Sequence, residues 1–202
     1  MAQKPKDIPL DERPDDDGFK APPKVATTEL IDKDKDDESL NKWKSSLLGN
    51  VKLDEDPNLP HVSIMELRVL IPGRDDIVLH LDKKEEIEKL PKNPFVLKEG
   101  TSYRFQLRFK VRREIVVGLK SMTFVYKKGI RVDKSEQMIG SYGPQQDLHS
   151  FTYPEDTAPT GMLARGHYKA KSRFIDDDLT NHLEFRYTFD IRKKWPEEEK
   201  KK

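Results

Sequence analysis

The chain of 202 residues contains no cysteine. Disulfide bonds, thiol nucleophiles and zinc sites with cysteine ligands are therefore excluded, and a reducing compartment suits the protein. The sequence also lacks any apolar run close to the ~18 residues that a membrane-spanning helix needs. Its N-terminal stretch has no apolar core of the kind that a signal peptide requires. We therefore expect a cytoplasmic protein.

The patterns of common catalytic, metal and cofactor sites are missing as well. The five histidines are scattered without a metal-ligand spacing. The acidic run 176–181 fails as a calcium loop, because Asn181 stands where the loop needs glycine and Tyr187 where it needs a bidentate glutamate. No glycine-rich phosphate loop is present, and the turn 140–143 is not that of a nucleophilic serine. We expect no enzyme, no metal and no cofactor, and hydrolase activity that depends on Ser141 would contradict this.

Charge is nearly balanced overall but unevenly distributed along the chain. Lysine and arginine number 38, aspartate and glutamate 37, and the hydrophobic share is only 34%. Residues 1–60 contain 10 basic and 15 acidic residues, which leaves 28 basic and 22 acidic residues in 61–202. The acidic segment could contact its own body or a basic partner, or be simply solvated. Nucleic-acid binding is not expected, because the net charge is only +1 and the basic strand faces carry no interleaved exposed aromatics.

The N-terminal part divides into a tail and a helical arm. Residues 1–24 are rich in proline, aspartate and lysine and bury too little apolar surface to fold, so we expect a disordered tail. Residues 25–60 form the predicted arm, in which 37–48 is an amphipathic helix with Asp37 as N-cap and Gly49 as its stop. Its apolar stripe consists of Leu40, Trp43, Leu47 and Leu48. Such a short helix is marginal alone, so the stripe must pack on the body of this protein or on another one.

From residue 62 onward the apolar period changes to two, which predicts β-strands. The alternating segments are 77–81, 103–111, 122–126, 167–175 and 183–191. A slip in the alternation at Met65 indicates a bulge, and 83–90 can add one helical turn. Seven or eight strands separated by turn signals favour an all-β, immunoglobulin-like β-sandwich over residues 61–196, followed by a charged tail over 197–202.

The inward-facing positions of these strands are unusually aromatic. They include Phe95, Tyr103, Phe105, Phe109, Phe124, Tyr126, Tyr168, Phe174, Phe185, Tyr187 and Phe189. The pattern fits a close-packed core, and it fits equally a core that contains a pocket. The strand that ends near residue 175 runs into three consecutive aspartates at 176–178, which repel one another unless water, a metal or a basic partner faces them. This cluster indicates a surface on which a partner docks.

Several long stretches together resemble the Rho GDP-dissociation inhibitor family. They are DKDDESLNKWKSSLLG (34–49), FVLKEG (95–100), REIVVGLK (113–120), DKSEQMIGSYGP (133–144), GMLARG (161–166) and SRFIDDDLTNHL (172–183). The resemblance extends from about residue 19 to residue 195, and so many motifs in matching order are highly specific.

The resemblance implies a non-enzymatic chaperone for prenylated, GDP-bound Rho-type GTPases. Such a protein blocks nucleotide dissociation, and it extracts the GTPase from membranes by holding the geranylgeranyl tail between its two sheets. In the same family, the arm is expected to bind the switch regions of the GTPase. We expect a 1:1 heterodimer and only a transient encounter with the membrane. Acidic groups near the pocket mouth would bind the polybasic tail of the GTPase, in competition with anionic lipid.

The same motifs imply roles for individual residues. Contacts with the GTPase are expected from Asp37, Leu40 and Trp43 in the arm and from Asp133 and Asp178 in the body. The expected prenyl pocket consists of Val69, Phe95, Tyr103, Ile115, Leu163, Phe185 and Tyr187. Family members commonly carry tryptophan at the last two positions, so the smaller rings here would reshape the cavity. Pro94 and His167 replace two serines of the family, which removes phosphorylation at these points.

Two other functions remain open at this level. A general carrier of lipidated proteins on a similar sandwich would have no use for the arm helix, so deleting residues 1–50 would leave target regulation intact. A structural sandwich that binds partners through its surface would have equal affinity for prenylated and unprenylated partners.

Overall fold

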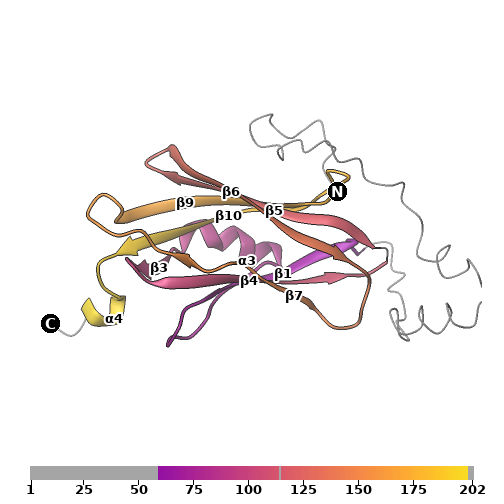
Figure 1. Cartoon of the computed structure of the whole chain (residues 1–202), viewed down its shortest axis with the longest axis horizontal. Coiled ribbons are helices and arrows are strands. Elements are labelled where there is room, and N and C mark those ends of the chain that lie inside the picture. Colours follow the sequence, from indigo (N-terminus) through magenta and orange to yellow (C-terminus); the bar gives the residue numbers. More distant parts are fainter. Residues whose placement is uncertain (1–58, 114, 200–202) are drawn as a thin grey trace, which may run out of the picture.

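The computed structural model describes residues 59–113 and 115–199, which form two β-sheets packed face to face (Figure 1). The first sheet has the order β2-β1-β4-β7, and β8 also pairs with β4. Its strands are β1 (Val62–Leu70), β2 (Ile77–His80), β4 (Ser102–Val111), β7 (His149–Thr152) and β8 (Asp156–Thr157). The expected all-β sandwich is confirmed.

The second sheet has the order β3-β10-β9-β5-β6. Its strands are β3 (Phe95–Lys98), β5 (Val116–Lys127), β6 (Ile130–Tyr142), β9 (Gly166–Ile175) and β10 (Asn181–Arg192). All neighbours are antiparallel except β3 and β10, which are parallel. The described residues thus contain ten strands, more than expected, because β7 and β8 are too short to show a clear alternation.

Local predictions for the body are largely confirmed. The register of β1 against β4 shifts between Ile64 and Glu66, which is the bulge expected at Met65. The helical turn expected before Pro91 is α3 (Lys84–Lys89), continued by the 3-10 helix η3 (Leu90–Lys92). A further short helix, α4 (Pro196–Glu199), follows β10. The tail and the arm up to residue 58 lie outside the described residues, and their boundaries stay predictions.

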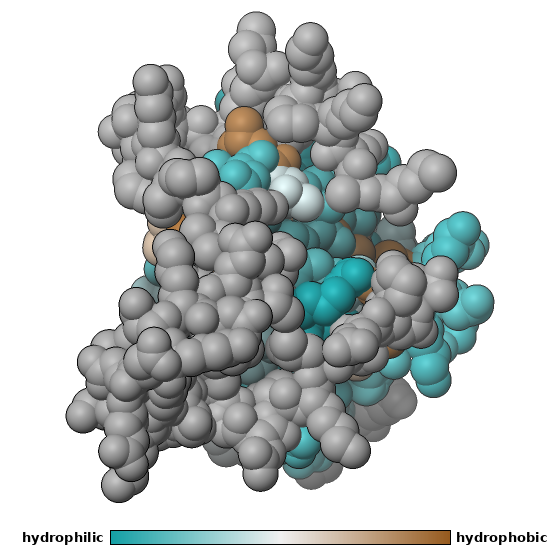
Figure 2. Space-filling view, turned by 90° about the vertical axis from the view of Figure 1, so that its right-hand side faces the viewer, coloured by the Kyte–Doolittle hydropathy of each residue, from teal (hydrophilic) through white to brown (hydrophobic). Residues whose placement is uncertain are grey.

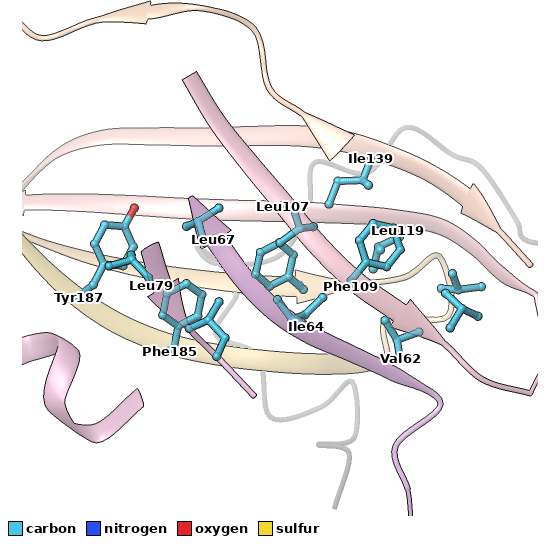
Figure 3. Packing of buried hydrophobic residues seen from close by; sticks show 14 of the residues in the cluster. Val62, Ile64, Leu67, Leu79, Leu107, Phe109, Leu119, Ile139, Phe185 and Tyr187 are labelled. Carbon is cyan, nitrogen blue, oxygen red and sulfur yellow. The ribbon is translucent and has the colours of Figure 1, made fainter. Parts of the chain in front are cut away.

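The main core lies between the sheets (Figure 3). Val62, Leu67, Leu107 and Phe109 come from the first sheet, and Leu119, Phe174, Phe185 and Tyr187 come from the second. One polar link also crosses the core, since the Tyr153 hydroxyl donates to Ser121 Oγ at 2.9 Å. The two sheets are therefore joined by packed side chains and by one partly buried hydrogen bond.

The facing of β5 differs from the expectation. Met122 and Phe124 are fully buried, but they form a separate cluster with Ile175 and lie opposite Arg173 and Lys171 of β9, on the face of the sheet that points away from β1 and β4. Placing Phe124 and Tyr126 in the core between the sheets was wrong. The inward face of β5 carries the smaller Ser121 and Thr123, so alternation groups Met122 with Phe124 but does not tell which face meets the other sheet.

The sandwich has two distinct ends (Figure 1). The hairpin end contains the tight turn between β5 and β6, the loop 161–165, the turn 71–76 between β1 and β2, and α4. The acidic-turn end contains residues 176–180 between β9 and β10, and the described surface seen from that side is mainly hydrophilic (Figure 2). Among the described residues, no helix is long and apolar enough to cross a membrane.

Candidate prenyl site and partner contacts

Five of the seven expected pocket residues lie together between the two sheets. Phe185 and Tyr187 of β10 are stacked with ring centroids 5.6 Å apart, and Phe95 of β3 stacks on Tyr187 at 6.1 Å. Phe95 and Tyr103 also pack against a second core cluster that contains the fully buried Val69. The five side chains thus form one continuous, largely aromatic seam, which we call the aromatic seam.

The seam is closed at its centre and open toward the hairpin end. Phe185 and Tyr187 are buried, with 3% and 4% of their surface exposed. Phe95 and Tyr103 are only half-buried although they face the other sheet, and so are the neighbouring Phe105 and Phe189. Inward-facing rings that remain in contact with water indicate that the sheets do not close over this end.

A cavity of about 560 Å³ lies beside the open part of the seam. Its apolar wall consists of Ile71, Ile77, Val96 and Trp195, and two of these, Ile71 and Trp195, belong to the same core cluster as Val69. Its volume falls within the roughly 300–1,000 Å³ that is typical of ligand pockets. Sequence reasoning missed Ile71 and Trp195, because the turn 71–76 and the segment after β10 show no strand alternation. It assigned Ile77 to a strand, and it assigned neither Ile77 nor Val96 to a pocket.

The rim of this cavity is charged. The Arg74 side chain already has partners within the protein, since its guanidinium lies over the Trp195 ring at 4.1 Å and forms an ion pair with Glu197 at 3.0 Å. Asp75 and Asp76 also line the rim and are exposed, and Asp76 lies 3.7 Å from Arg68. The rim therefore offers carboxylates beside an apolar wall.

The two tyrosines of the seam are neutral hydrogen-bonding groups. Burial raises the pKa of Tyr187 to about 12, although a hydrogen bond with Ser172 opposes the shift. Burial also raises the pKa of Tyr103, helped by the hydrogen bond that its hydroxyl donates to Asp156 at 2.9 Å. The phenol groups thus bring no charge into the apolar seam.

The other two expected pocket residues lie elsewhere. Ile115, 41% exposed, precedes β5 at the acidic-turn end. Leu163, 90% exposed, lies at the hairpin end, where its carbonyl accepts a hydrogen bond from Lys127. Because β5 runs from Val116 to Lys127, these two sites are roughly 36 Å apart along the strand. One pocket does not contain both in this conformation.

The residues expected to contact the GTPase are also spread out. Asp133 is exposed near the start of β6, opposite Val125, and Asp178 is exposed in the turn at the acidic-turn end. The two carboxylates mark two separate points on the second sheet. The arm residues Asp37, Leu40 and Trp43 lie outside the described residues, so their contacts stay predictions.

The three consecutive aspartates of the turn have different structural roles. Asp176 is buried, and its carboxylate accepts hydrogen bonds from the backbone N–H groups of Asp178 and Thr180 and from His182 Nε2 at 3.0 Å. Asp177 is partly buried and lies 3.6 Å from Lys120 Nζ. Hydrogen bonds and a lysine within the fold therefore compensate the charges of Asp176 and Asp177, and Asp178 is the aspartate whose side chain is exposed.

The close approach of Asp177 also explains one glycine. Gly118 has a positive φ of 61°, and a Cβ at this position would lie 1.9 Å from Asp177 Oδ2. Its N–H donates to Ser141 Oγ at 3.0 Å. Ser141, the only serine considered for catalysis, is thus a backbone acceptor at this end of the sandwich. Among the described residues, no group of three or more His, Asp or Glu side chains is arranged to hold a metal ion.

Comparison with known proteins gives a consistent result over nearly the whole chain. A family model described as RHO protein GDP dissociation inhibitor matches residues 5–194. Bovine Rho GDP-dissociation inhibitor 1 is 44% identical over 180 residues, which cover 88% of this chain and 86% of that protein. Rho GDP-dissociation inhibitor 1 of Arabidopsis thaliana is 43% identical over 177 residues, covering 86% and 72%. The inhibitor of Schizosaccharomyces pombe is 38% identical over 188 residues, covering 90% and 92%.

Proposed function

The chain belongs to the Rho GDP-dissociation inhibitor family, a family of non-enzymatic regulators of Rho GTPases, and from this we propose how it holds its partner. The prenyl tail of a GDP-bound Rho GTPase enters at the hairpin end and lies along the aromatic seam between the sheets. The protein binds the GTPase as a 1:1 heterodimer in the cytoplasm. Nucleotide dissociation and return of the GTPase to the membrane are then both blocked.

The half-buried, inward-facing rings of Phe95 and Tyr103 carry this proposal. A prenyl chain needs a dry apolar surface, because each buried CH₂ group contributes about 0.8 kcal/mol. The open part of the seam and the adjoining cavity provide apolar atoms that are accessible without unfolding the core. Insertion of the chain would push the two sheets apart locally and complete the burial of these rings.

The charged rim supports the entry route. Asp75 and Asp76 lie beside the apolar wall formed by Ile77 and Trp195. A polybasic segment next to the prenylated residue of the GTPase would meet these carboxylates as the lipid enters. The order of groups on the protein, acidic and then apolar, matches the order of basic and lipid groups on such a tail.

Truncation of a seam residue tests the pocket directly. Phe95→Ala removes a ring that would contact the prenyl chain, and we expect affinity for a prenylated peptide to fall by about 1–3 kcal/mol, the range of an aromatic hot spot. Phe151→Ala is the matched control, since this ring is also half-buried but lies on the edge strand β7 and packs against Tyr153. Fluorescence titration gives the affinity, and urea denaturation reports the stability of both variants. Equal loss of peptide affinity in both variants would place the lipid elsewhere.

The predicted arm helix provides the second contact with the GTPase. For Trp43→Ala we expect a loss of roughly 1–3 kcal/mol in binding a prenylated, GDP-loaded Rho GTPase, because a large apolar anchor is removed from the interface. Calorimetric titration measures the loss. Lys42→Ala, next to Trp43 but outside the apolar stripe, serves as control. A Trp43→Ala variant that binds like the unmodified protein would leave the arm without its proposed role.

A further inference from the structure

The loop 161–165 is firmly held by two other parts of the fold. The Glu99 carboxylate accepts hydrogen bonds from Arg165 Nε and Nη2 at 2.8 and 2.7 Å and from the Gly161 N–H at 3.0 Å. On the other side, Lys127 Nζ donates to the carbonyls of Leu163 and Arg165 at 2.6 and 2.8 Å. The hydrogen bonds from Arg165 and Gly161 also lower the pKa of Glu99, so the carboxylate stays ionised at neutral pH.

This fixed loop displays apolar side chains to water. Leu163 is 90% exposed and Met162 81% exposed, and Ile130, in the hairpin that Lys127 leads into, is 71% exposed. These are the three highest exposures among the large hydrophobic residues that the structure describes. Both segments lie at the hairpin end (Figure 1). A loop that is pinned cannot fold its apolar side chains inward, and such a patch marks an interaction surface.

Basic side chains gather beside this patch on the outer face of the second sheet. A cavity of about 440 Å³ is lined by Gly129 of the hairpin and by Lys169, Lys171 and Arg186. Lys171 and Arg186 are direct partners across β9 and β10, an arrangement in which like charges repel. Lys171 is paired with Glu184 at 3.3 Å, whereas Lys169 and Arg186 are exposed and form no ion pair with another described residue.

We propose that the hairpin end docks on an anionic lipid bilayer, with Met162, Leu163 and Ile130 at the level of the headgroups and with lipid phosphates in the basic cavity. This inference rests on the proposed function, since the protein must reach the membrane to remove a GTPase from it. The cations attract anionic lipid. They repel the polybasic tail of the GTPase and a second copy of the same surface, so neither of these fits as the occupant.

The surface also lies where the proposed mechanism needs it. The loop 161–165, the hairpin and the turn 71–76 that borders the prenyl cavity all lie at the same end of the sandwich (Figure 1). Docking in this orientation would hold the cavity mouth close to the bilayer. A prenyl chain could then pass from lipid to protein with little exposure to water.

Extraction of a prenylated GTPase from vesicles tests the apolar part of the surface. For Met162→Asp we expect extraction from phosphatidylserine-containing vesicles to be about fivefold slower or more, because a charge at the headgroup level opposes insertion. Affinity for a prenylated peptide in solution should stay unchanged. Met138→Asp is the matched control, a 48% exposed methionine on β6 that lies opposite Lys120, toward the acidic-turn end, and it should change neither quantity. Normal extraction by Met162→Asp would overturn the proposal, and so would a parallel loss of peptide affinity, which would assign the loop to the prenyl site.

Charge reversal tests the basic part. The double variant Lys169→Glu and Arg186→Glu should slow extraction from phosphatidylserine-containing vesicles and leave extraction from neutral phosphatidylcholine vesicles unchanged. Equal slowing on both would exclude lipid charge as the reason. Co-sedimentation of the chain alone with the same two kinds of vesicle keeps this test separate from the prenyl pocket. The two proposals can fail separately. If the protein did not bind a prenylated peptide, the proposed pocket would be wrong. Docking would still be supported if the unmodified chain sedimented preferentially with anionic vesicles and the Met162→Asp variant lost this preference.

Discussion

A Rho GTPase without its prenyl group is expected to bind this protein about a thousandfold more weakly than the prenylated form, or roughly 4 kcal/mol. A geranylgeranyl tail left in water is unfavourable by on the order of 10 kcal/mol. Part of the gain from burying it is offset, because the tail must displace packing between Phe95, Tyr103 and the opposite sheet. The remaining difference should still be the largest effect of any single change in the complex.

Titration of both GTPase forms in the GDP state measures this difference. The Phe95→Ala variant should bind the unprenylated form as the unmodified protein does, since in the proposed complex the ring contacts the lipid and not the GTPase itself. Equal affinity for the two forms would favour a structural sandwich that binds through its surface. Intact regulation after deletion of residues 1–50 would favour a general carrier of lipidated proteins.

Asp176→Ala is expected to destabilise the fold by about 3–5 kcal/mol, although its neighbours in the acidic triplet look equivalent in sequence. The substitution removes one buried carboxylate that accepts from two backbone N–H groups and from His182, which is itself buried. The buried His182 and the two backbone N–H groups would then lose their acceptor. Urea denaturation monitored by tryptophan fluorescence measures the loss.

Asp178→Ala is the control for this prediction. Its side chain is exposed, so its removal should change the free energy of unfolding by less than about 1 kcal/mol. In the proposed complex it should weaken GTPase binding instead. Equal destabilisation by the two substitutions would show that the turn does not depend on the buried carboxylate.

Strand alternation was a reliable guide where one face of a strand is clearly polar. In β10 the residues Phe185, Tyr187 and Phe189 alternate with charged or hydroxyl side chains, and the structure places all three between the sheets. The bulge at Met65 was predicted for the same reason, because a slip of one residue reverses the facing of everything that follows. The facing of β10 and the position of the bulge are both set by residues that are adjacent in the sequence.

The prediction failed in β5, whose more apolar face points away from the other sheet. Met122 and Phe124 pack with Ile175 on the outer face, while Ser121 and Thr123 face inward and form hydrogen bonds with Tyr153 and Ser172. Hydrophobicity alone assigned the larger side chains to the core. The choice between the two faces depends on which one meets the other sheet, and that is a property of the assembled sandwich.

The sequence by itself determined the family, the β-sandwich class and the aromatic character of the seam, because motif order and side-chain period are properties of the linear chain. Tertiary structure alone decided where the seam is open, which aspartate of the triplet faces outward, and that Met162, Leu163 and Ile130 share one end with the basic cavity. These features bring together residues from strands far apart in sequence. Burial and charge pairing depend on the distances between such strands, which no local pattern encodes.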